Sequence, residues 1–298
     1  MSEAVAIFLD GSIYAAWLFL VAVGLTLVYG VMKIVNVAHG ATYTVGAYAA
    51  VSLCGAWAAG GGNEWGIYLP LVLAAPVVGL ILGPILERLF LRPLRDEEET
   101  VLMLVTYALF LILEDSVKFI WGVDPYFLSE PYLLPGGIDI FDLTYPVYNF
   151  GMLIAATVVG VGLAWFLSKS KSGRIVRAVI HDREVAMAMG ANVDRIYLAV
   201  FSFGCALAAL GGALTAPTVS VIPSMGVEVI VLAFAVVVIG GMGSIIGALL
   251  GALLVGFVRA MAVHLLPEAE LFIIYLVMAT VLLVRPSGLF APAEARKI

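Results

Sequence analysis

Six residues that combine polar side chains with glycine lie within eleven positions, between two long apolar runs: Asn36, His39, Gly40, Thr42, Tyr43 and Gly46. Polar side chains in such surroundings are costly unless they face a cavity or one another, and glycine permits close helix approach or a break in a helix. The segment could therefore line a path for a polar solute, with Asn36 and His39 capping a broken helix or contacting the solute. The alternative is an inner-face helix cap, with His39 hydrogen-bonded to the backbone.

A second glycine-rich segment has the same character. Four of its residues predict a break between two helices, with free backbone groups that line a cavity: Gly240, Gly241, Gly243 and Ser244. Glycine at 243, 247 and 251 also forms a stripe of small residues that brings helices together. No Lys-Ser or Lys-Thr pair follows, so this is not a phosphate-binding loop. Segments 24–48 and 231–256 both join two apolar runs through such a break, which indicates either an internal repeat around a transport path or coincidence.

The largest polar stretch runs from Ser168 to Arg195 and holds six of the fifteen Lys and Arg residues. Its Ala, Met, Arg and Glu content favours a helix up to Gly190, and Asn192 can cap the helix that follows. Alanines at 178, 186 and 188 leave little bulk on one face, which suits insertion into a groove on another protein. Residues 169–195 therefore predict a docking loop. The alternative is a solvated loop whose arginines only hold the topology.

Charged residues inside the apolar runs are few. Glu114 and Lys118 are spaced i,i+4 and can pair, with Asp115 beside them, while Glu228 and Arg259 lie near the outer ends of other runs. Such groups leave one alternative open, an ion-coupled secondary transporter or channel that acts without a partner ATPase. The three histidines are scattered and no HExxH, CxxC or GxSxG motif occurs, so the sequence predicts neither a metal site nor an enzyme.

The composition places these residues in a membrane protein. Of 298 residues, 63% are hydrophobic and 12% charged, with a mean hydropathy of +1.11, which leaves too little polar cover for a soluble globule. Continuous apolar runs select helices rather than a barrel, so we predict a single all-α polytopic domain (1–298) of about eight to ten transmembrane helices, some of them broken or re-entrant. The predicted spans are 12–32, 37–60, 66–86, 100–121, 146–168, 196–217, 227–239, 244–265 and 269–285.

The basic residues predict an orientation. Residues 1–11 carry Glu3 and Asp10 and no basic residue, which argues for an outside N-terminus and against a cleaved signal peptide. With that start, thirteen of the fifteen Lys and Arg residues fall on the inner side, Arg296 and Lys297 included. This bias predicts an N-out/C-in topology. The outer segment 122–145, rich in Pro, Gly and aromatic residues, is expected to be an ordered loop with a short interfacial helix or a docking surface.

Over nearly its whole length the chain resembles the LivH-like permease subunits of branched-chain amino acid ABC importers. Five segments in this order carry the resemblance: GLTLVYGVMKIVNVAHGATYTVGAY (24–48), ERLFLRPLR (87–95), SGRIVRAVIHDREVAMAMGANVDR (172–195), VVIGGMGSIIGALLGALLVG (237–256) and VRPSGLF (284–290). The resemblance implies that 169–195 is an ATPase-docking segment. The residues expected to dock are Arg174, Arg177, Asp182, Glu184, Ala186 and Gly190.

The resemblance also implies partners and a location. The chain would lie in the cytoplasmic (inner) membrane of a bacterium or archaeon, beside a second homologous permease subunit, two cytoplasmic ATP-binding subunits and an extracytoplasmic solute-binding protein. ATP would be hydrolysed by the partner subunits, with no cofactor in this chain. The expected solutes are branched-chain amino acids or related small polar solutes such as amides, urea and organic acids. Leu232 stands where several relatives have lysine, so the choice among these solutes stays open.

Overall fold

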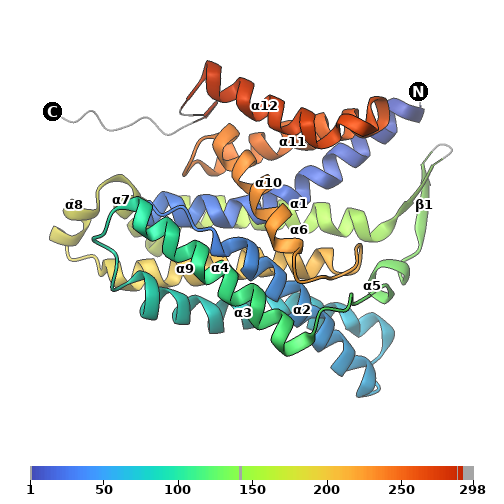
Figure 1. Cartoon of the computed structure of the whole chain (residues 1–298), viewed down its shortest axis with the longest axis horizontal. Helices are drawn as coiled ribbons and strands as arrows, with labels where there is room; N and C mark the ends of the chain where they lie inside the picture. The colour runs from blue at the N-terminus through green and yellow to red at the C-terminus, as the bar shows by residue number, and fades with distance from the viewer. Residues whose placement is uncertain (1, 141–142, 287, 291–298) are drawn as a thin grey trace.

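A computed structural model describes residues 2–140, 143–286 and 288–290 of the chain. Long helices run side by side along the longest axis of the molecule (Figure 1). Over the described residues, nine helices overlap the nine predicted spans, although α1 begins ten residues before its span, and eight of the nine are apolar enough to support an all-α polytopic membrane protein. The nine helices are α1 (Ser2–Met32), α2 (Ala38–Ala59), α3 (Tyr68–Leu86), α4 (Glu99–Trp121), α6 (Val147–Lys169), α9 (Val193–Thr215), α10 (Met225–Gly240), α11 (Ile245–Leu265) and α12 (Glu270–Val284).

The described part of the chain contains six helices that are long and apolar enough to cross a membrane, and two shorter apolar ones. Helix α10 has 16 residues and is therefore about 24 Å long, less than the hydrocarbon core of about 30 Å, as its short apolar run predicted. Large apolar side chains point away from the bundle, among them Leu80 on α3 and Phe119 on α4, which are 72% and 93% exposed. Such an outer surface suits lipid rather than water.

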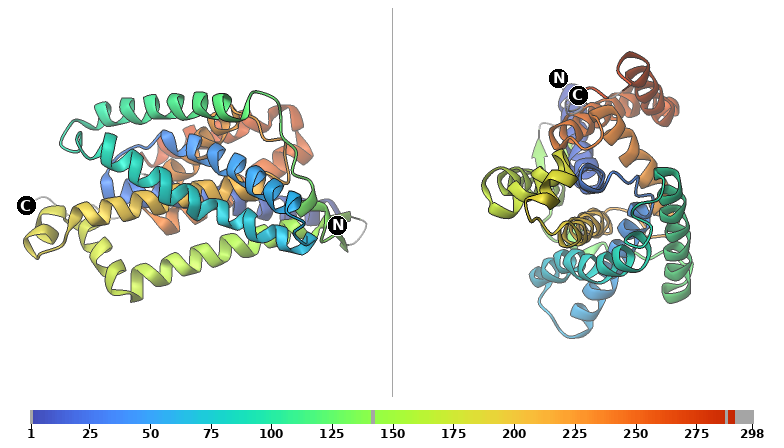
Figure 2. Two further views of the ribbon diagram at one scale, coloured as in Figure 1. Left: turned by 90° about the horizontal axis from the view of Figure 1, so that it is seen from below. Right: turned by 90° about the vertical axis from the view of Figure 1, so that its left-hand side faces the viewer.

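Small residues bring the helices together. Helix α1 packs between α6, α9 and α11, and α4 and α6 lie on opposite edges of the bundle (Figure 2). Gly46 of α2 faces the backbone of Ala209 on α9, and Gly256 of α11 faces the carbonyl of Gly11 on α1. A Cβ atom at these glycines would overlap the neighbouring backbone. Lipid supplies no hydrophobic force between helices, so this close packing holds the bundle together.

One end of the bundle, here called the hairpin end, carries the segment that follows α4. It contains the short helix α5 (Glu130–Leu133) and an antiparallel hairpin of β1 (Gly137–Ile140) and β2 (Leu143–Pro146). Figure 1 shows β1 projecting beyond the helices. The predicted ordered loop is confirmed for the described residues, but the strands were not anticipated, because four-residue strands leave little periodic signal. Tyr126 is bridged to Val221 by two backbone hydrogen bonds of 3.0 and 2.9 Å, which tie this segment to the α9–α10 connection.

The opposite end, the loop end, carries α7 (Lys171–His181) and α8 (Arg183–Ala188). These two helices project beyond α6 and α9 in Figure 1. The predicted single helix in the docking loop is therefore two, separated at Asp182, whose extended backbone (φ −154°, ψ 108°) ends the first helix. Also at this end, α3 continues into a π-helical turn, Glu87–Leu91, which is closed by a hydrogen bond of 2.7 Å from Arg92 N–H to the Glu87 carbonyl.

The two predicted breaks lie next to each other. The first observed break, 33–37, separates α1 from α2 and begins at Lys33, whose φ of 57° is positive. It includes Asn36, but residues 38–46 of the predicted segment are helical and no side chain caps α2, so the prediction that Asn36 and His39 cap a broken helix is wrong. The second separates α10 from α11 and includes Gly241 and Gly243, with φ of 101° and 84°. A Cβ atom at Gly30 would lie 3.5 Å from the Cα of Gly243. The last turn of α1, just before the first break, therefore lies against the second break.

The C-terminal segment returns to the second break. Leu289 N–H donates to the Ile239 carbonyl at 2.9 Å, and Phe290 N–H donates to the Gly240 carbonyl at 3.0 Å. These carbonyls lie in the last turn of α10, where a helix leaves its acceptors without internal partners. The segment therefore completes the end of α10. Arg296 and Lys297, which contributed to the predicted orientation, lie outside the described residues.

Candidate functional site

Side-chain caps fix each corner of the docking loop. Ser170 Oγ accepts from Gly173 N–H at 2.8 Å and begins α7, and Asp182 Oδ1 accepts from Val185 N–H at 3.0 Å and begins α8. Asn192 Oδ1 accepts from Arg195 N–H at 3.0 Å and begins α9, as the sequence predicted. Each cap satisfies a backbone donor that the helix itself leaves unpaired. The loop is therefore a defined structure of two short helices.

The predicted docking residues have different surroundings. Arg174, Arg177 and Glu184 are exposed, and Gly190 forms the turn after α8 with φ of +88°. Ala186 is only 4% exposed and faces the bundle of its own chain. The prediction that alanines 178, 186 and 188 form one face open to another protein is therefore wrong for Ala186.

Exposed apolar side chains on α8 and the turn after it give the loop a different free surface. Val185, Met187 and Met189 are 57%, 43% and 84% exposed. Methionine side chains adapt to irregular apolar grooves, and this cluster lies at the far tip of the loop end. The loop therefore presents flexible apolar side chains together with the exposed charges of Arg174, Arg177 and Glu184.

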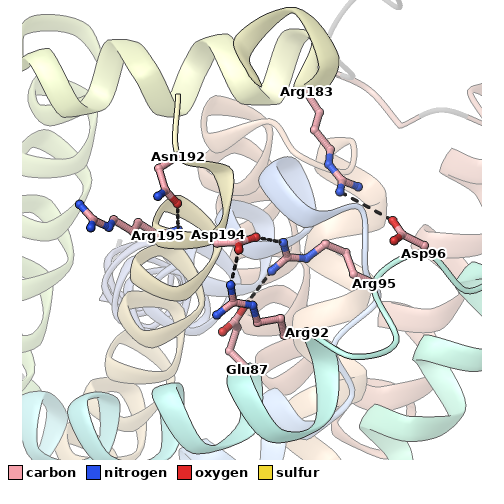
Figure 3. Close-up of polar contacts among 8 residues, drawn as sticks. All are labelled: Glu87, Arg92, Arg95, Asp96, Arg183, Asn192, Asp194 and Arg195. Atoms are coloured by element: carbon pink, nitrogen blue, oxygen red, sulfur yellow. Dashed lines mark hydrogen bonds and ion pairs between the residues drawn. The ribbon is translucent and has the colours of Figure 1, made fainter. Parts of the chain in front are cut away.

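An ion network joins this loop to the helices beneath it (Figure 3). Arg95 lies at its centre: one guanidinium nitrogen is 2.9 Å from Glu87 Oε1, and another bonds to the carboxylate of Asp194 at the start of α9. Arg92 bonds to the other oxygen of Asp194. The side chains of Glu87 and Arg95 are only 1% and 10% exposed, whereas those of Arg92 and Asp194 are about half exposed, at 47% and 44%. The network thus has a buried pair and an outer pair.

A tyrosine ring extends the network toward α8. The Arg95 guanidinium lies 4.5 Å from the ring centre of Tyr197 on α9, and that of Arg183 lies 5.8 Å from the same ring. Arg183 also reaches Asp96 at 3.7 Å. Cations over an aromatic face are attracted to its electron density. Side chains from the end of α3, from α8 and from the start of α9 therefore share one set of contacts.

The predicted pathway residues around position 40 are mostly buried between helices. His39 is fully buried, with Nε2 2.9 Å from the Val21 carbonyl, and Thr42 Oγ1 donates to the His39 carbonyl at 2.7 Å. Gly40 packs against the carbonyl of Gly226. Asn36 is 1% exposed, and neither its Oδ1 nor its Nδ2 has a hydrogen-bond partner among the described residues. The structure thus places His39 in the backbone-bonded arrangement that was the alternative to solute contact.

The second predicted segment also packs. Gly240 faces the carbonyl of Gly247 on the next helix, and Ser244 Oγ accepts from Gly247 N–H at 3.0 Å, which caps α11. Tyr43 is different, because it lines the larger of the two cavities described below; the other nine predicted pathway residues line neither of them. The two glycine segments therefore bring helices together, and the hollow of the molecule lies elsewhere.

The larger cavity has a volume of about 630 Å³ and lies toward the hairpin end, between residues 10–17 of α1, Tyr43 of α2, the first turns of α6 and α10 and the last turns of α9 and α11. This is within the range of about 300–1,000 Å³ that is usual for small-molecule sites. Its polar lining is Asp10, Tyr14, Trp17, Tyr43, Tyr132, Asn149, Thr215, Thr218, Ser220, Ser224, Glu228, Arg259 and His264. The smaller cavity, about 450 Å³ between α1, α6 and α11, has an almost wholly apolar lining.

Three of the charged or titratable groups that line the larger cavity, Asp10, Arg259 and His264, have an ionic partner. His264 Nε2 is 2.9 Å from Asp10 Oδ2, and Arg259 Nη2 is 2.5 Å from Glu270 Oε1. The Arg259 guanidinium also lies 4.0 Å from the ring centre of Tyr14. These pairs connect the ends of α1, α11 and α12 and position the cavity wall.

The charges on α4 lie apart from both cavities. Lys118 Nζ is 3.0 Å from Glu114 and 3.0 Å from Asp115, which confirms the predicted i,i+4 pair. None of the three lines either of these two cavities. Among the residues that the structure describes, no group of three or more His, Cys, Asp or Glu side chains has the geometry of a metal site.

Two groups of residues were missed. Arg92 and Arg95 were counted only as topology signals, although Glu87 and the two arginines within nine positions, with Asp194 after the docking loop, are consistent with an ion network. Glu228 and Arg259 were noted near the outer ends of apolar runs, but they were not assigned to one site, since they lie 31 positions apart and on different helices. No sequence signal connects such residues without the fold.

Comparison with known proteins identifies the family. Residues 7–282 match the family described as branched-chain amino acid transport system / permease component. The chain is 29% identical over 294 residues to the high-affinity branched-chain amino acid transport system permease protein LivH of Escherichia coli K12, covering 97% of this chain and 94% of that protein. It is 31% identical over 300 residues to the probable branched-chain amino acid transport permease protein LivH of Methanocaldococcus jannaschii, covering 94% and 91%.

A solved structure shares the fold. PsaBC from Streptococcus pneumoniae in complex with Fab aligns with a TM-score of 0.50 and 12% identity, over 97% of this chain and 93% of that one. At this identity the match supports the helical architecture alone. The family match covers the nine helices that overlap the predicted spans, except the ends of the first and the last. The chain therefore belongs to the permease components of branched-chain amino acid transport systems.

Proposed function

We propose that this chain is the transmembrane permease subunit of an ATP-binding-cassette importer for branched-chain amino acids or related small solutes. The observation that supports this most strongly is the match to the permease family over 7–282, together with a polytopic helical fold. A solute-binding protein would deliver the solute outside, and ATP would be hydrolysed by two partner subunits. A second homologous permease would complete the pathway in the cytoplasmic membrane of a bacterium or archaeon.

The orientation of this proposal is N-out/C-in. It puts the hairpin end and its cavity of about 630 Å³ outside, where a binding protein can release solute, and it puts α7 and α8 inside. The excess of Lys and Arg at the loop end supports this assignment, since cytoplasmic loops carry such an excess.

The docking loop would receive the ATPases through α8. Met187, Met189 and Val185 offer an apolar surface, and Glu184 and Arg177 offer charges beside it. A push on α8 would reach α9 and the end of α3 through the contacts of Arg183, Arg95 and Asp194. Because α9 packs on α1, α2 and α3, the motion would spread to the helices that surround the cavity.

Two measurements test the proposal. Purification of the tagged chain from its native membrane in a mild detergent should recover two ATPases and a second permease. Glu184→Arg should weaken recovery of the ATPases and lower ATP-driven uptake by at least tenfold, because it reverses a charge in the docking surface. Glu64→Arg, an exposed carboxylate at the hairpin end, is the matched control and should retain both.

A self-sufficient, ion-coupled transporter is the rival. It would purify without ATPases, and uptake would persist when ATP is depleted while the ion gradient is kept. It would also depend on Glu114, Asp115 or Glu228. Glu114 and Asp115 pair with Lys118 and line neither cavity, whereas Glu228 lines the larger one. Uptake that survives neutralisation of all three would exclude the rival. Recovery of a lone homo-oligomer with ATP-independent uptake would refute the importer assignment.

A further inference from the structure

Of the two carboxylates that line the cavity at the hairpin end, one has no ion-pair partner among the described residues. Asp10 bonds to His264, and Arg259 bonds to Glu270. Glu228 lines the same cavity, is exposed, and has no ion-pair or hydrogen-bond partner among the described residues. Glu228 is therefore the cavity carboxylate that is left without an internal partner in the described structure.

The position of Glu228 suits a negatively charged side chain. It lies in the first turn of α10, where the helix dipole and the free backbone N–H groups favour a negative charge. It lines the cavity and is exposed, so a solute in the cavity can reach it. A cation that entered the cavity would meet a fixed carboxylate without having to displace an internal partner. A protonated amine is the common organic cation that makes charge-assisted hydrogen bonds of this kind.

The rest of the lining defines what such a cation would be attached to. Arg259 uses Nη2 for Glu270 and rests one face on Tyr14, which leaves other guanidinium donors for an anion. The polar groups occupy part of the wall only. An apolar wall completes the site: Ile13, Met152, Ile222, Val229 and Leu232. One acceptor of positive charge, one donor group for negative charge and an apolar wall fit a small zwitterion with an apolar side chain.

We propose that this cavity is a recognition site for a zwitterionic amino acid, in which Glu228 accepts the ammonium group and Arg259 donates to the carboxylate. The inference rests on the proposed function and deepens it, because it locates substrate selection within the permease itself. Glu228 is the specificity-determining residue of the site. A solute without an amine leaves Glu228 unpaired and binds weakly, since a charged group that loses water without gaining a partner costs free energy.

The test measures how tightly three probe molecules bind to the purified full chain in detergent micelles. Binding is detected by saturation-transfer NMR. Leucine carries both charges, isopentylamine only the amine, and 4-methylpentanoate only the carboxylate. We expect wild-type binding in the order leucine, isopentylamine, 4-methylpentanoate, with the last at least tenfold weaker than leucine. Glu228→Gln, which keeps the shape of the side chain, should lower the affinity for leucine and for isopentylamine at least tenfold. The affinity for 4-methylpentanoate should stay the same or rise.

Two further variants separate recognition from folding. Leu232→Lys lies one turn after Glu228 on the same face of α10, so its ammonium can pair with Glu228 from within and should abolish the preference for amines. Glu114→Gln removes a carboxylate outside the cavity and should change nothing, because Lys118 keeps Asp115 as its partner. Equal binding of all three probes to the wild type, or unchanged amine binding in Glu228→Gln, would overturn the assignment.

The outcome is independent of the importer assignment. If uptake depends on the partner ATPases but Glu228→Gln binds amines normally, the recognition site is refuted and the proposed function stands. If binding depends on Glu228 but uptake persists without ATP, the proposed function is refuted and the recognition site stands.

Discussion

Removing Arg95 should destabilise the chain far more than removing Arg92, although both arginines bond to Asp194. The carboxylate of Glu87 is 1% exposed, and Arg95 is the partner of its Oε1. In Arg95→Met a buried charge is left without a counter-ion, which typically costs about 3–5 kcal/mol. Arg92 and Asp194 are about half exposed, so solvent screens them, and Arg92→Met should cost about 1 kcal/mol or less.

A double-mutant cycle tests the reasoning. Glu87→Leu combined with Arg95→Met replaces the buried pair with apolar side chains, which is often close to neutral, so the double variant should recover most of the loss. The free energy of unfolding would be measured by steric trapping in bicelles for the wild type, both single variants and the double variant. The explanation fails if Arg95→Met costs no more than Arg92→Met, or if the double variant is as unstable as the single one.

Three further predictions concern a turn, a close helix contact and a helix cap. Gly190→Val should cost about 1–2 kcal/mol because its φ of +88° disfavours any side chain. Thermal unfolding should show a similar loss for Gly122→Val, which has φ of +87° at the other end of the bundle, while only the change at Gly190 should reduce ATPase recovery in the mild-detergent purification. Gly46→Ala should destabilise by about 1–3 kcal/mol, since its Cβ would overlap the α9 backbone, whereas Gly55→Ala meets open space and should gain about 1 kcal/mol; equal stabilities of the two in bicelles would contradict the packing argument. Asp182→Ala removes the cap of α8 and should lower stability by about 1 kcal/mol, with increased hydrogen exchange confined to α8; protection that stays at the wild-type level would show that the cap is dispensable.

The apolar helices were predictable because the bilayer acts on each segment separately. A run of apolar residues must satisfy its backbone internally, so length and hydropathy alone determine a helix such as α11. The caps at Asn192 and the stop at Gly190 were predictable for the same reason, because capping depends on neighbouring residues only. The i,i+4 spacing likewise predicted the pair of Glu114 and Lys118.

The roles of individual polar residues depended on tertiary packing. Asn36 and His39 stand in a segment that resembles a pathway lining, yet the close contact of α2 with α9 and α10 buries them between helices. Ala186 belongs to a face that seemed free, yet α8 folds back and turns it toward its own chain. Local sequence does not distinguish a glycine-rich segment that packs from one that lines a cavity, because the role depends on which residues of other helices lie next to it.

By itself, the sequence determined the helices, their ends, the polar loop and the family to which the chain belongs, since each depends on residues close together in the chain or on order along it. The tertiary structure decided which charges meet. Arg95 finds Asp194 across 99 positions, and Arg259 finds Glu270 while Glu228 stays unpaired in the described structure. The physical reason is that a charge responds to whatever lies within a few ångströms, and in a helical bundle those neighbours come from other helices whose packing no local pattern specifies.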